Sequence, residues 1–360
     1  PDTVRPIHYQ LHIKPDAANL SFTGNVAIDV DVRSTINEIT LNAVNLKFSN
    51  SKLGDDIINK VSYDAKNGTA TLSLSKPANP GRYTLHIDYK QDGKVIRALY
   101  TQFEAVYARE MLPSWDEPAL KATFDFSATV PENLMAVSNM PISVTENTGN
   151  GLKTVHFSRT PKMSTYLLFF SLGDFERISK TVNGIEVGII TKRGDSAKGQ
   201  YALDSAVQLI PYYEEYFGVK YPLPKLDMLA APGSSQFFGA MENWGAIFYF
   251  ENALLLDPAI STESNRRGVY EVVAHEIAHQ WFGNLVTMSW WDDLWLNEGF
   301  ASWITSKVTQ KFHPEWKPWL DKQSGVNWVM NQDSLKGTHP IIQPVLDATQ
   351  ATEAFDGITY

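Results

Sequence analysis

The chain has 360 residues and a formal net charge of -9, so it lacks the basic surface that nucleic-acid-binding proteins present. Apolar residues make up 43% of the sequence, which is enough to build buried cores and excludes a disordered chain. Cysteine is absent, and this excludes disulfides, thiolate metal ligands and thiol nucleophiles.

The length favours two domains, because single hydrophobic cores rarely grow beyond about 250–300 residues. No apolar run approaches the roughly 20 residues that cross a bilayer as a helix, so we expect a soluble protein without a membrane span. The given sequence begins at Pro1 without the charged and apolar regions of a signal peptide and without a lipidation motif, and we interpret this start as a trimmed or processed end. An exported protein gains from having no stray thiols, so the missing cysteine favours a periplasmic or secreted protein over a cytoplasmic one.

Residues 1–176 are predicted to form an antiparallel, sandwich-like β domain. In the stretch 25–33 valine and isoleucine alternate with alanine and aspartate, the period-two pattern of a strand with one solvated face. Turn-forming pairs such as Asn67-Gly68 separate the strand-like stretches. Similar patterns occur at 71–75, 83–89, 123–130 and 166–172.

Residues 177–360 are predicted to form an α+β domain, and this domain carries the chemistry. Short β segments are expected at 185–191 and 225–230, the second of them buried. Amphipathic or capped helices are expected at about 202–217, 263–282 and 294–309. Helix ends are signalled by Gly218 and Gly283, and helix starts by Ser261, Thr262 and Ser264.

The helix expected at about 263–282 contains the motif His275-Glu276-Ile-Ala-His279. Histidines four residues apart leave the same face of a helix about one turn apart, so they can share a metal ion. Glu298, separated from His279 by eighteen residues, can supply a third, oxygen ligand. Two imidazoles and a carboxylate, with one position left for water, form a catalytic rather than a structural zinc site. We therefore predict one zinc ion per chain, held by His275, His279 and Glu298.

Zinc lowers the pKa of its bound water to about 7, so a hydroxide-like nucleophile forms at neutral pH. Glu276 is not expected to ligate the metal. Instead it can accept the water proton and deliver it to the leaving amine, as general base and then general acid. Zinc also polarises the scissile carbonyl, and the whole set is typical of peptide or ester hydrolysis rather than redox chemistry.

Other conspicuous residues have simpler interpretations. The remaining histidines lack a metal-binding spacing, and we expect them to be structural: His8, His12, His86, His156, His313 and His339. Five tryptophans are expected to pack behind the metal helix rather than to bind a cation or cofactor: Trp281, Trp290, Trp291, Trp295 and Trp303. Asp292-Asp293 is expected to begin a helix.

Further motifs resemble the aminopeptidase N-type zinc metallopeptidases, a gluzincin family. Gly239-Ala-Met-Glu-Asn243 stands ahead of the zinc motif and Glu298, in the order typical of that family. The resemblance covers nearly the whole chain and implies a thermolysin-like α+β catalytic domain after the β domain. Its remaining motifs are Pro6-Ile-His-Tyr9, Thr101-Gln-Phe-Glu-Ala105, Arg109, Pro113-Ser-Trp-Asp-Glu-Pro118 and Phe355-Asp-Gly-Ile-Thr-Tyr360.

The resemblance implies a zinc-dependent aminopeptidase that hydrolyses the first peptide bond of peptides with a free N-terminus. Glu242 would bind the α-ammonium of the substrate, with Gln102 and Glu104 contributing from the β domain. Carboxylates without an adjacent lysine or arginine are suited to an ammonium group. An anchor of this kind, one residue from the scissile bond, makes the enzyme an exopeptidase.

The same resemblance implies roles for the residues on either side of Glu242 and for the last residue of the chain. The backbone of Gly239 and Ala240 would pair with an extended peptide, as an edge strand does. Phe238 would line the pocket for the first side chain, and Met241 belongs to the same substrate-binding stretch. Tyr360 would place its hydroxyl on the oxyanion, opposite the zinc.

The chain departs from the family pattern at two places. Family members have a longer segment between Tyr89 and Thr101, so residues near 90–91 join ends across a stretch that is missing here. They also continue beyond Tyr360 with further domains that close the active site. We therefore expect an N-terminal portion of a longer protein, with Tyr360 on an unsupported end and poor activity on its own.

Two other functions remain open. An epoxide hydrolase of the leukotriene-processing branch would share the zinc site, but that branch typically has glycine at the position of Ala240. Turnover of a fatty-acid epoxide would identify it. A non-catalytic binding or scaffold fragment would retain the fold alone, and the intact set of His275, Glu276, His279 and Glu298 argues against it. Absence of zinc would favour that interpretation.

Overall fold

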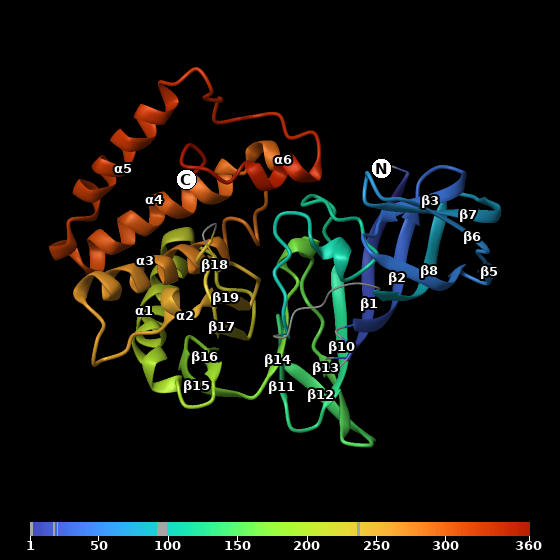
Figure 1. Cartoon of the computed structure of the whole chain (residues 1–360), viewed down its shortest axis with the longest axis horizontal. Helices are drawn as coiled ribbons and strands as arrows, with labels where there is room; N and C mark the ends of the chain where they lie inside the picture. Colours follow the sequence, from blue (N-terminus) through green and yellow to red (C-terminus); the bar gives the residue numbers. More distant parts are fainter. Residues whose placement is uncertain (1–2, 17–18, 20, 92–98, 236–237) are drawn as a thin grey trace. The chain divides into compact units, whose positions relative to one another are not determined.

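The computed structural model describes residues 3–16, 19, 21–91, 99–235 and 238–360 (Figure 1). The chain forms two compact units, Pro1–Gly173 and Asp174–Tyr360. Asp92 and Gly93, which belong to the predicted junction near residues 90–91, lie outside the described residues. No helix in the described part of the chain is both long enough and apolar enough to cross a membrane.

The first unit is built on an eight-stranded sheet with the order β12-β13-β10-β1-β2-β8-β4-β5. Buried valines and isoleucines alternate with more exposed residues along β2, as the pattern at 25–33 predicts. Its strands are β1 (Val4–Asp16), β2 (Ser21–Val32), β4 (Leu46–Leu53), β5 (Asp56–Ile57), β8 (Gly81–Gln91), β10 (Thr123–Pro131), β12 (Ile142–Gly149) and β13 (Leu152–Phe157).

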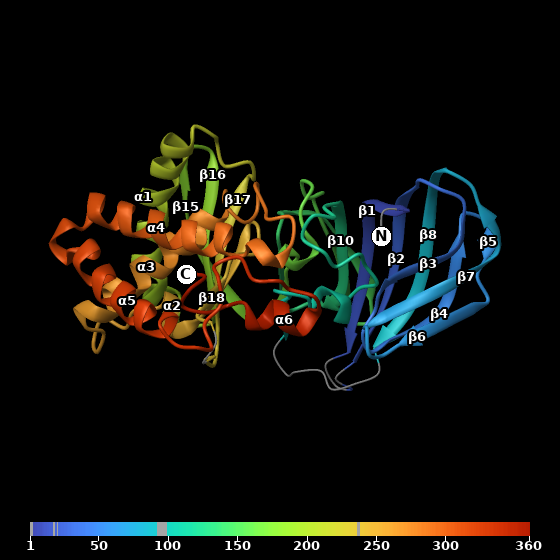
Figure 2. The same ribbon diagram turned by 90° about the horizontal axis from the view of Figure 1, so that it is seen from above.

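Two three-stranded sheets complete this unit, and Figure 2 shows one of them, β3-β7-β6, beside the strands of the large sheet. The strands of that sheet are β3 (Ile36–Asn42), β6 (Lys60–Asp64) and β7 (Thr69–Ala78). The other has the order β11-β14-β9, with β9 (Leu99–Tyr100), β11 (Met135–Ser138) and β14 (Phe170–Gly173). The prediction of a β-rich first half is confirmed.

The prediction of purely antiparallel pairing is wrong at one ladder. Strands β1 and β10 run parallel, from His8 opposite Thr123 to Ile13 opposite Ala128. A parallel pair requires a long crossover connection, and more than a hundred residues separate these two strands. Alternation of apolar and polar residues reveals which face of a strand is buried. It does not reveal whether the strand runs parallel or antiparallel to its neighbour.

The motif at 113–118 contributes a buried ion pair to this unit. Arg109, in the short 3-10 turn η1 (Ala108–Glu110), donates from Nε to Asp116 Oδ2 at 2.9 Å and from Nη2 to the Asp116 carbonyl at 3.0 Å. The Thr165 hydroxyl donates to the other carboxylate oxygen at 2.5 Å. Because both charged side chains are buried, each depends on the other in place of water.

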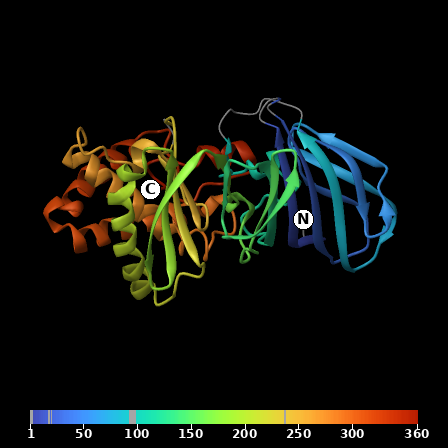
Figure 3. The same cartoon turned by 90° about the horizontal axis from the view of Figure 1, so that it is seen from below.

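The second unit is built on a five-stranded sheet with the order β15-β16-β17-β19-β18 (Figure 3). The pairs β16/β17 and β17/β19 are parallel, and the two outer pairs are antiparallel. β17 is buried along its whole length, as predicted, and β18 is an edge strand. The strands are β15 (Phe175–Val182), β16 (Ile185–Lys192), β17 (Lys225–Ala231), β18 (Ala240–Met241) and β19 (Ala246–Phe250).

Helices cover this sheet, with α1 packed against β15 and β16, and α3 packed against both α1 and α4 (Figures 1 and 3). The α-helices are α1 (Gln200–Phe217), α2 (Glu251–Leu254), α3 (Glu263–His279), α4 (Trp295–Phe312), α5 (Pro318–Asp333) and α6 (Ala348–Glu353). Further 3-10 turns are η2 (Thr165–Leu167) in the first unit, and η3 (Ser196–Gly199), η4 (Trp291–Asp293) and η5 (Pro314–Trp316) in the second. The mixed α/β character predicted for the second half is confirmed.

The ends of the predicted helices follow their sequence signals. Thr262 caps α3: its hydroxyl accepts the Asn265 N–H at 3.3 Å, and the Asn265 side chain accepts the Thr262 N–H at 2.9 Å. Gly218 ends α1 in the left-handed conformation, with φ +67°. Helix α5 has no counterpart among the predicted helices. Only Pro318 of its residues is buried, so the helix has no extended buried face.

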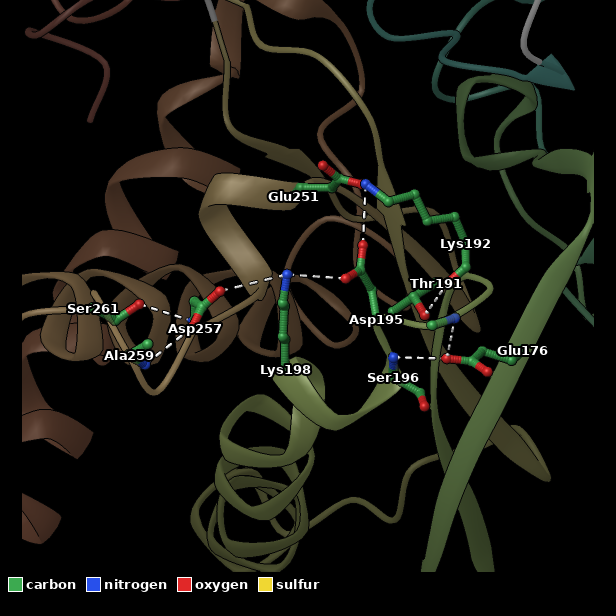
Figure 4. Close-up of polar contacts among 11 residues, drawn as sticks. Glu176, Thr191, Lys192, Asp195, Ser196, Lys198, Glu251, Asp257, Ala259 and Ser261 are labelled. Atoms are coloured by element: carbon green, nitrogen blue, oxygen red, sulfur yellow. Dashed lines mark hydrogen bonds and ion pairs between the residues drawn. The ribbon is translucent and has the colours of Figure 1, made fainter.

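A chain of alternating charges joins the start of α1 to the loop that precedes α3 (Figure 4). The Lys192 ammonium contacts Glu251 at 2.8 Å and Asp195 at 3.0 Å. The Lys198 ammonium contacts Asp195 at 3.0 Å and Asp257 at 3.6 Å. Exposed pairs stabilise little one by one, but this network connects α2 and the loop at Asp257 to the sheet side of the unit.

Replacing Asp116 with alanine should destabilise the first unit by about 3–5 kcal/mol, because Arg109 would be left buried and unpaired. Urea unfolding followed by circular dichroism measures the effect. Arg33→Ala is the control, since it breaks an exposed pair with Asp31 and should change stability little. Equal, small effects of the two substitutions would contradict a structural role for the buried pair.

Candidate active site

The packing of α3 against α4 brings three predicted ligands together. His275 and His279 face α4 from the last turns of α3, and Glu298 lies in the first turn of α4. The two Nε2 atoms are 2.9 Å apart. Glu298 Oε2 lies 3.2 Å from His275 Nε2 and 3.4 Å from His279 Nε2. Three ligand atoms from positions that span 24 residues of sequence therefore converge on one point.

These distances fit a metal ion. Bonds of about 2.0–2.1 Å to a tetrahedral zinc place neighbouring ligand atoms about 3.3 Å apart, close to the spacing observed here. His279 Nδ1 lies 2.9 Å from the Phe282 carbonyl, so Nδ1 carries the proton and Nε2 presents its lone pair. The donor set and the orientation of His279 thus match a zinc site with a position left open.

Two of the three candidate ligands favour the protonation state that a metal ligand requires. Burial lowers the pKa of His275 below its usual value, and the neutral imidazole is the form that ligates. Burial alone would raise the pKa of Glu298, but the neighbouring His279 and His275 hold it well below its usual range. Glu298 is therefore an ionised carboxylate, the form required of an oxygen ligand.

Glu276 lies beside His275 but is not part of the ligand set. Its side chain is 6% exposed, and Oε2 has no hydrogen-bond partner among the described residues. Burial raises the pKa of Glu276 well above its usual value, and the nearby Glu242 and Glu298 raise it further against the opposing effect of His279. A buried carboxyl group with an unused oxygen and a raised pKa is suited to exchange a proton with a bound molecule.

A cleft of about 560 Å³ opens over this group of residues. His275 and Glu276 line it from α3, and Tyr360 lines it from the end of the chain. Phe238, Gly239 and Ala240 form another wall, at the edge of the sheet. The cleft thus combines the candidate metal site, the buried Glu276 and an exposed sheet edge.

The predicted substrate-binding stretch runs along that edge. Ala240 and Met241 form β18, paired with Tyr249 and Phe248 of β19, and the Phe250 N–H donates to the Gly239 carbonyl at 3.0 Å. Phe238 is 36% exposed and packs on Phe250 with ring centroids 5.3 Å apart. Met241 is only 1% exposed, so its side chain belongs to the core and only its backbone follows the edge.

Glu242 is positioned by two amides that directly follow the metal-binding motif. The Glu242 carbonyl accepts Gln280 Nε2 at 3.0 Å and Asn284 Nδ2 at 2.8 Å. Gln280 also donates to the Glu276 carbonyl at 3.2 Å and accepts the Gly245 N–H at 3.2 Å. The loop that carries Glu242 is therefore attached to the end of the metal helix. Sequence reasoning missed Gln280 and Asn284, since amides that bind backbone have no diagnostic spacing.

The Glu242 side chain is itself buried, at 3% exposure, and its Oε1 has no hydrogen-bond partner among the described residues. Burial raises the pKa of Glu242 to about 6; the nearby Glu298 raises it further and His279 opposes the rise. A carboxylate in this position gains from any cation that reaches it, because a buried charge without a partner is costly.

Tyr360 lies next to the metal site. Its ring stacks on that of His275, with centroids 6.0 Å apart and an interplanar angle of 21°. Asp356 supports the segment: its Oδ1 accepts the N–H groups of Ile358 at 3.0 Å and Thr359 at 3.1 Å. The Tyr360 N–H donates to the Asp356 carbonyl at 3.3 Å, while the residue is 46% exposed, so the expectation of an unsupported end stays a prediction.

Gln102 and Glu104 belong to the first unit, between β9 and η1. Gln102 lines a pocket of that unit together with Phe103, Tyr107 and Glu110. The role of Gln102 and Glu104 in substrate binding stays a prediction.

The predicted packing of five tryptophans behind the metal helix is clearest for Trp281. Trp281 is buried against Tyr213, Phe217 and Tyr221. Trp290 instead donates from Nε1 to the Val345 carbonyl at 2.6 Å, and Trp303 is 38% exposed. Trp291 is buried at the start of α4, and Trp295 lines a second, apolar pocket there.

Comparison with known protein families covers both units. Residues 5–167 match the family described as Peptidase M1 N-terminal domain, and residues 201–360 match the Peptidase family M1 domain. Gln102 and Glu104 fall in the first match, and every residue of the candidate metal site falls in the second.

Named relatives give the same assignment. Aminopeptidase N of Acetobacter pasteurianus is 44% identical over 321 residues, which cover 84% of this chain and 90% of that protein. Aminopeptidase M1-B of Oryza sativa subsp. japonica is 38% identical over all of this chain, which covers 43% of it. The puromycin-sensitive aminopeptidase of Caenorhabditis elegans is also 38% identical over all of this chain, which covers 40% of it. The chain thus spans less than half the length of the rice and nematode proteins.

His279→Ala should abolish stoichiometric binding of a divalent metal, because one of three converging ligands is lost. Metal content after exhaustive dialysis, measured by inductively coupled plasma mass spectrometry, tests this. The control is His313→Ala, a histidine of the same unit that stacks on Trp316 and lies outside the ligand set. Metal retained by His279→Ala, or lost equally from both variants, would contradict the assignment.

Proposed function

The chain belongs to peptidase family M1, and from that premise we propose that it forms the metal-binding portion of a zinc aminopeptidase that hydrolyses the first peptide bond of peptides with a free N-terminus. The convergence of His275, His279 and Glu298 beside the buried Glu276 is the observation that supports this most strongly. When bound, zinc supplies Lewis acidity, which polarises a carbonyl and acidifies water. The rice and nematode relatives extend well beyond this chain, whereas the match covers 90% of the Acetobacter relative.

Glu276 acts as the proton carrier of the reaction. Its carboxylate takes a proton from the attacking water as the new C–O bond forms at the scissile carbonyl. The same proton then passes to the amine nitrogen as the C–N bond breaks, so the carboxylate is regenerated. The buried oxygen without a partner and the raised pKa of Glu276 suit both transfers.

Glu242 fixes where the chain is cut. Its buried carboxylate would bind the α-ammonium of the substrate, with Gln102 and Glu104 as further contributors. Gln280 and Asn284 hold the Glu242 backbone to the end of the metal helix, and this sets the distance from the ammonium to the scissile bond. Cleavage at an internal bond would place an uncharged peptide group at Glu242 instead of an ammonium group. The buried carboxylate would then stay unpaired, which disfavours internal cleavage.

The rest of the cleft wall orients the peptide. The edge strand β18 can extend its sheet by one peptide strand, with main-chain hydrogen bonds from Gly239 and Ala240. Phe238 would line the space for the first side chain. Tyr360, stacked beside His275, would donate a hydrogen bond to the developing oxyanion.

The protein should release the fluorophore from an amino-acyl arylamide and leave the N-acetylated arylamide intact. Acetylation removes the positive charge that Glu242 would bind, so we expect a loss of at least about 10²-fold, as for a lost hydrogen bond to a charged group. Fluorescence assays on the two substrates at equal concentration measure the ratio. Equal rates on both would rule out anchoring through the ammonium group.

A further inference from the structure

One wall of the cleft carries a lysine that the proposed function leaves unused. Lys322 lies on α5 and lines the same cleft as His275, Glu276 and Tyr360. It is half-buried, and among the described residues no carboxylate pairs with its ammonium group. Burial lowers the pKa of Lys322 below its usual value, with no carboxylate near enough to oppose the shift.

The other cation on this wall, Arg267, is paired with two carboxylates. Arg267 donates from Nε to Glu271 at 2.9 Å, and its Nη1 contacts Asp321 and the Trp316 carbonyl, the latter at 3.2 Å. Its two carboxylates are thereby occupied as well. Among the described residues that line the cleft, Lys322 is therefore the lysine or arginine without a carboxylate partner, and its ammonium group has three donors.

Lys322 and Glu242 come from different elements around the metal site. Lys322 lines the cleft from α5 together with His275, whereas Glu242 directly follows the edge strand β18 and its carbonyl is bound by Gln280 and Asn284. Glu242 is the proposed anchor of the substrate ammonium. A peptide anchored there and cut at the metal site would place its remaining residues beyond the scissile bond, in the cleft that Lys322 lines.

The wall around Lys322 offers further hydrogen-bonding groups. Ser302, Thr305 and Ser306 of α4 line the same cleft. Thr305 Oγ1 is buried and has no hydrogen-bond partner among the described residues. A hydroxyl donor beside an ammonium group is a suitable environment for a carboxylate.

We propose that Lys322 binds a carboxylate on the leaving-group side of the scissile bond and so makes the enzyme favour peptides whose second residue carries one. This inference rests on the proposed function and narrows its substrate class. The carboxylate can be the C-terminus of a dipeptide or the side chain of aspartate or glutamate, and the chemistry of recognition is the same for both.

Four substrates with alanine as first residue separate these sources: Ala-Ala, Ala-Ala-amide, Ala-Asp-amide and Ala-Asn-amide. The first pair differs only in a terminal carboxylate, and the second pair differs only in a side-chain carboxylate. We expect the carboxylate member of at least one pair to have a kcat/KM about 10-fold higher or more, as for a hydrogen bond to a charged group. If kcat/KM differs within the first pair, Lys322 binds the terminal carboxylate; if it differs within the second pair, Lys322 binds the side-chain carboxylate.

Lys322→Met should bring that ratio to about 1, and Lys322→Arg should retain most of it, because the charge is kept. Lys311→Met, at an exposed lysine in the last turn of α4, is the matched control and should keep the wild-type ratio. A ratio that survives in Lys322→Met, or no ratio in the wild type, would overturn the inference.

A second assay, hydrolysis of an amino-acyl arylamide by the wild type, shows whether the protein is an aminopeptidase at all. It therefore distinguishes a wrong role for Lys322 from a wrong proposed function. Arylamide cleavage without a carboxylate preference overturns the role of Lys322 alone. No cleavage of arylamide or peptide by the metal-loaded protein overturns both.

Discussion

The packing of α3 against α4 is the constraint on which the site depends. It holds two imidazole nitrogens and a carboxylate oxygen within 3.4 Å of one another. Imidazole nitrogens and carboxylate oxygens are ligands that zinc prefers, so the fold presents a ligand set that a bound zinc ion would stabilise. The Thr262 cap and the ion pairs around Lys192 and Lys198 fix the start of α3 and the loop ahead of it.

The second constraint is the attachment of the sheet edge to the metal helix. Gln280 and Asn284 each bind the Glu242 carbonyl, and Gln280 also reaches the backbone of Gly245 and Glu276. The position of Glu242 relative to His275 and His279 is therefore set by rigid, buried contacts rather than by a free loop. A hydrolase that cleaves the peptide bond one residue away from the α-ammonium group needs a fixed distance between the ammonium site and the metal site.

Local signals in the sequence predicted much of the second unit. Both the shared face of His275 and His279 and the cap at Thr262 depend on residues that are close in sequence along one helix. Such local relations can be read from the residue pattern. The parallel pairing of β1 with β10 depends on a distant connection, and the burial of Met241 depends on the sheet beneath it. Helix α5 buries only Pro318, and Gln280 acts through backbone contacts, so neither produces a periodic pattern of buried residues. The compartment inferred from the missing cysteine stays a prediction.

The central claim is that Glu276 serves a zinc ion held by three other residues. The most direct measurement compares zinc content and arylamide hydrolysis in wild type and Glu276→Gln. Because glutamine fills the same space but cannot accept a proton, the variant should keep one zinc ion per chain and lose about 10²–10⁴-fold in kcat. Undiminished turnover, or loss of the zinc along with the activity, would contradict the account.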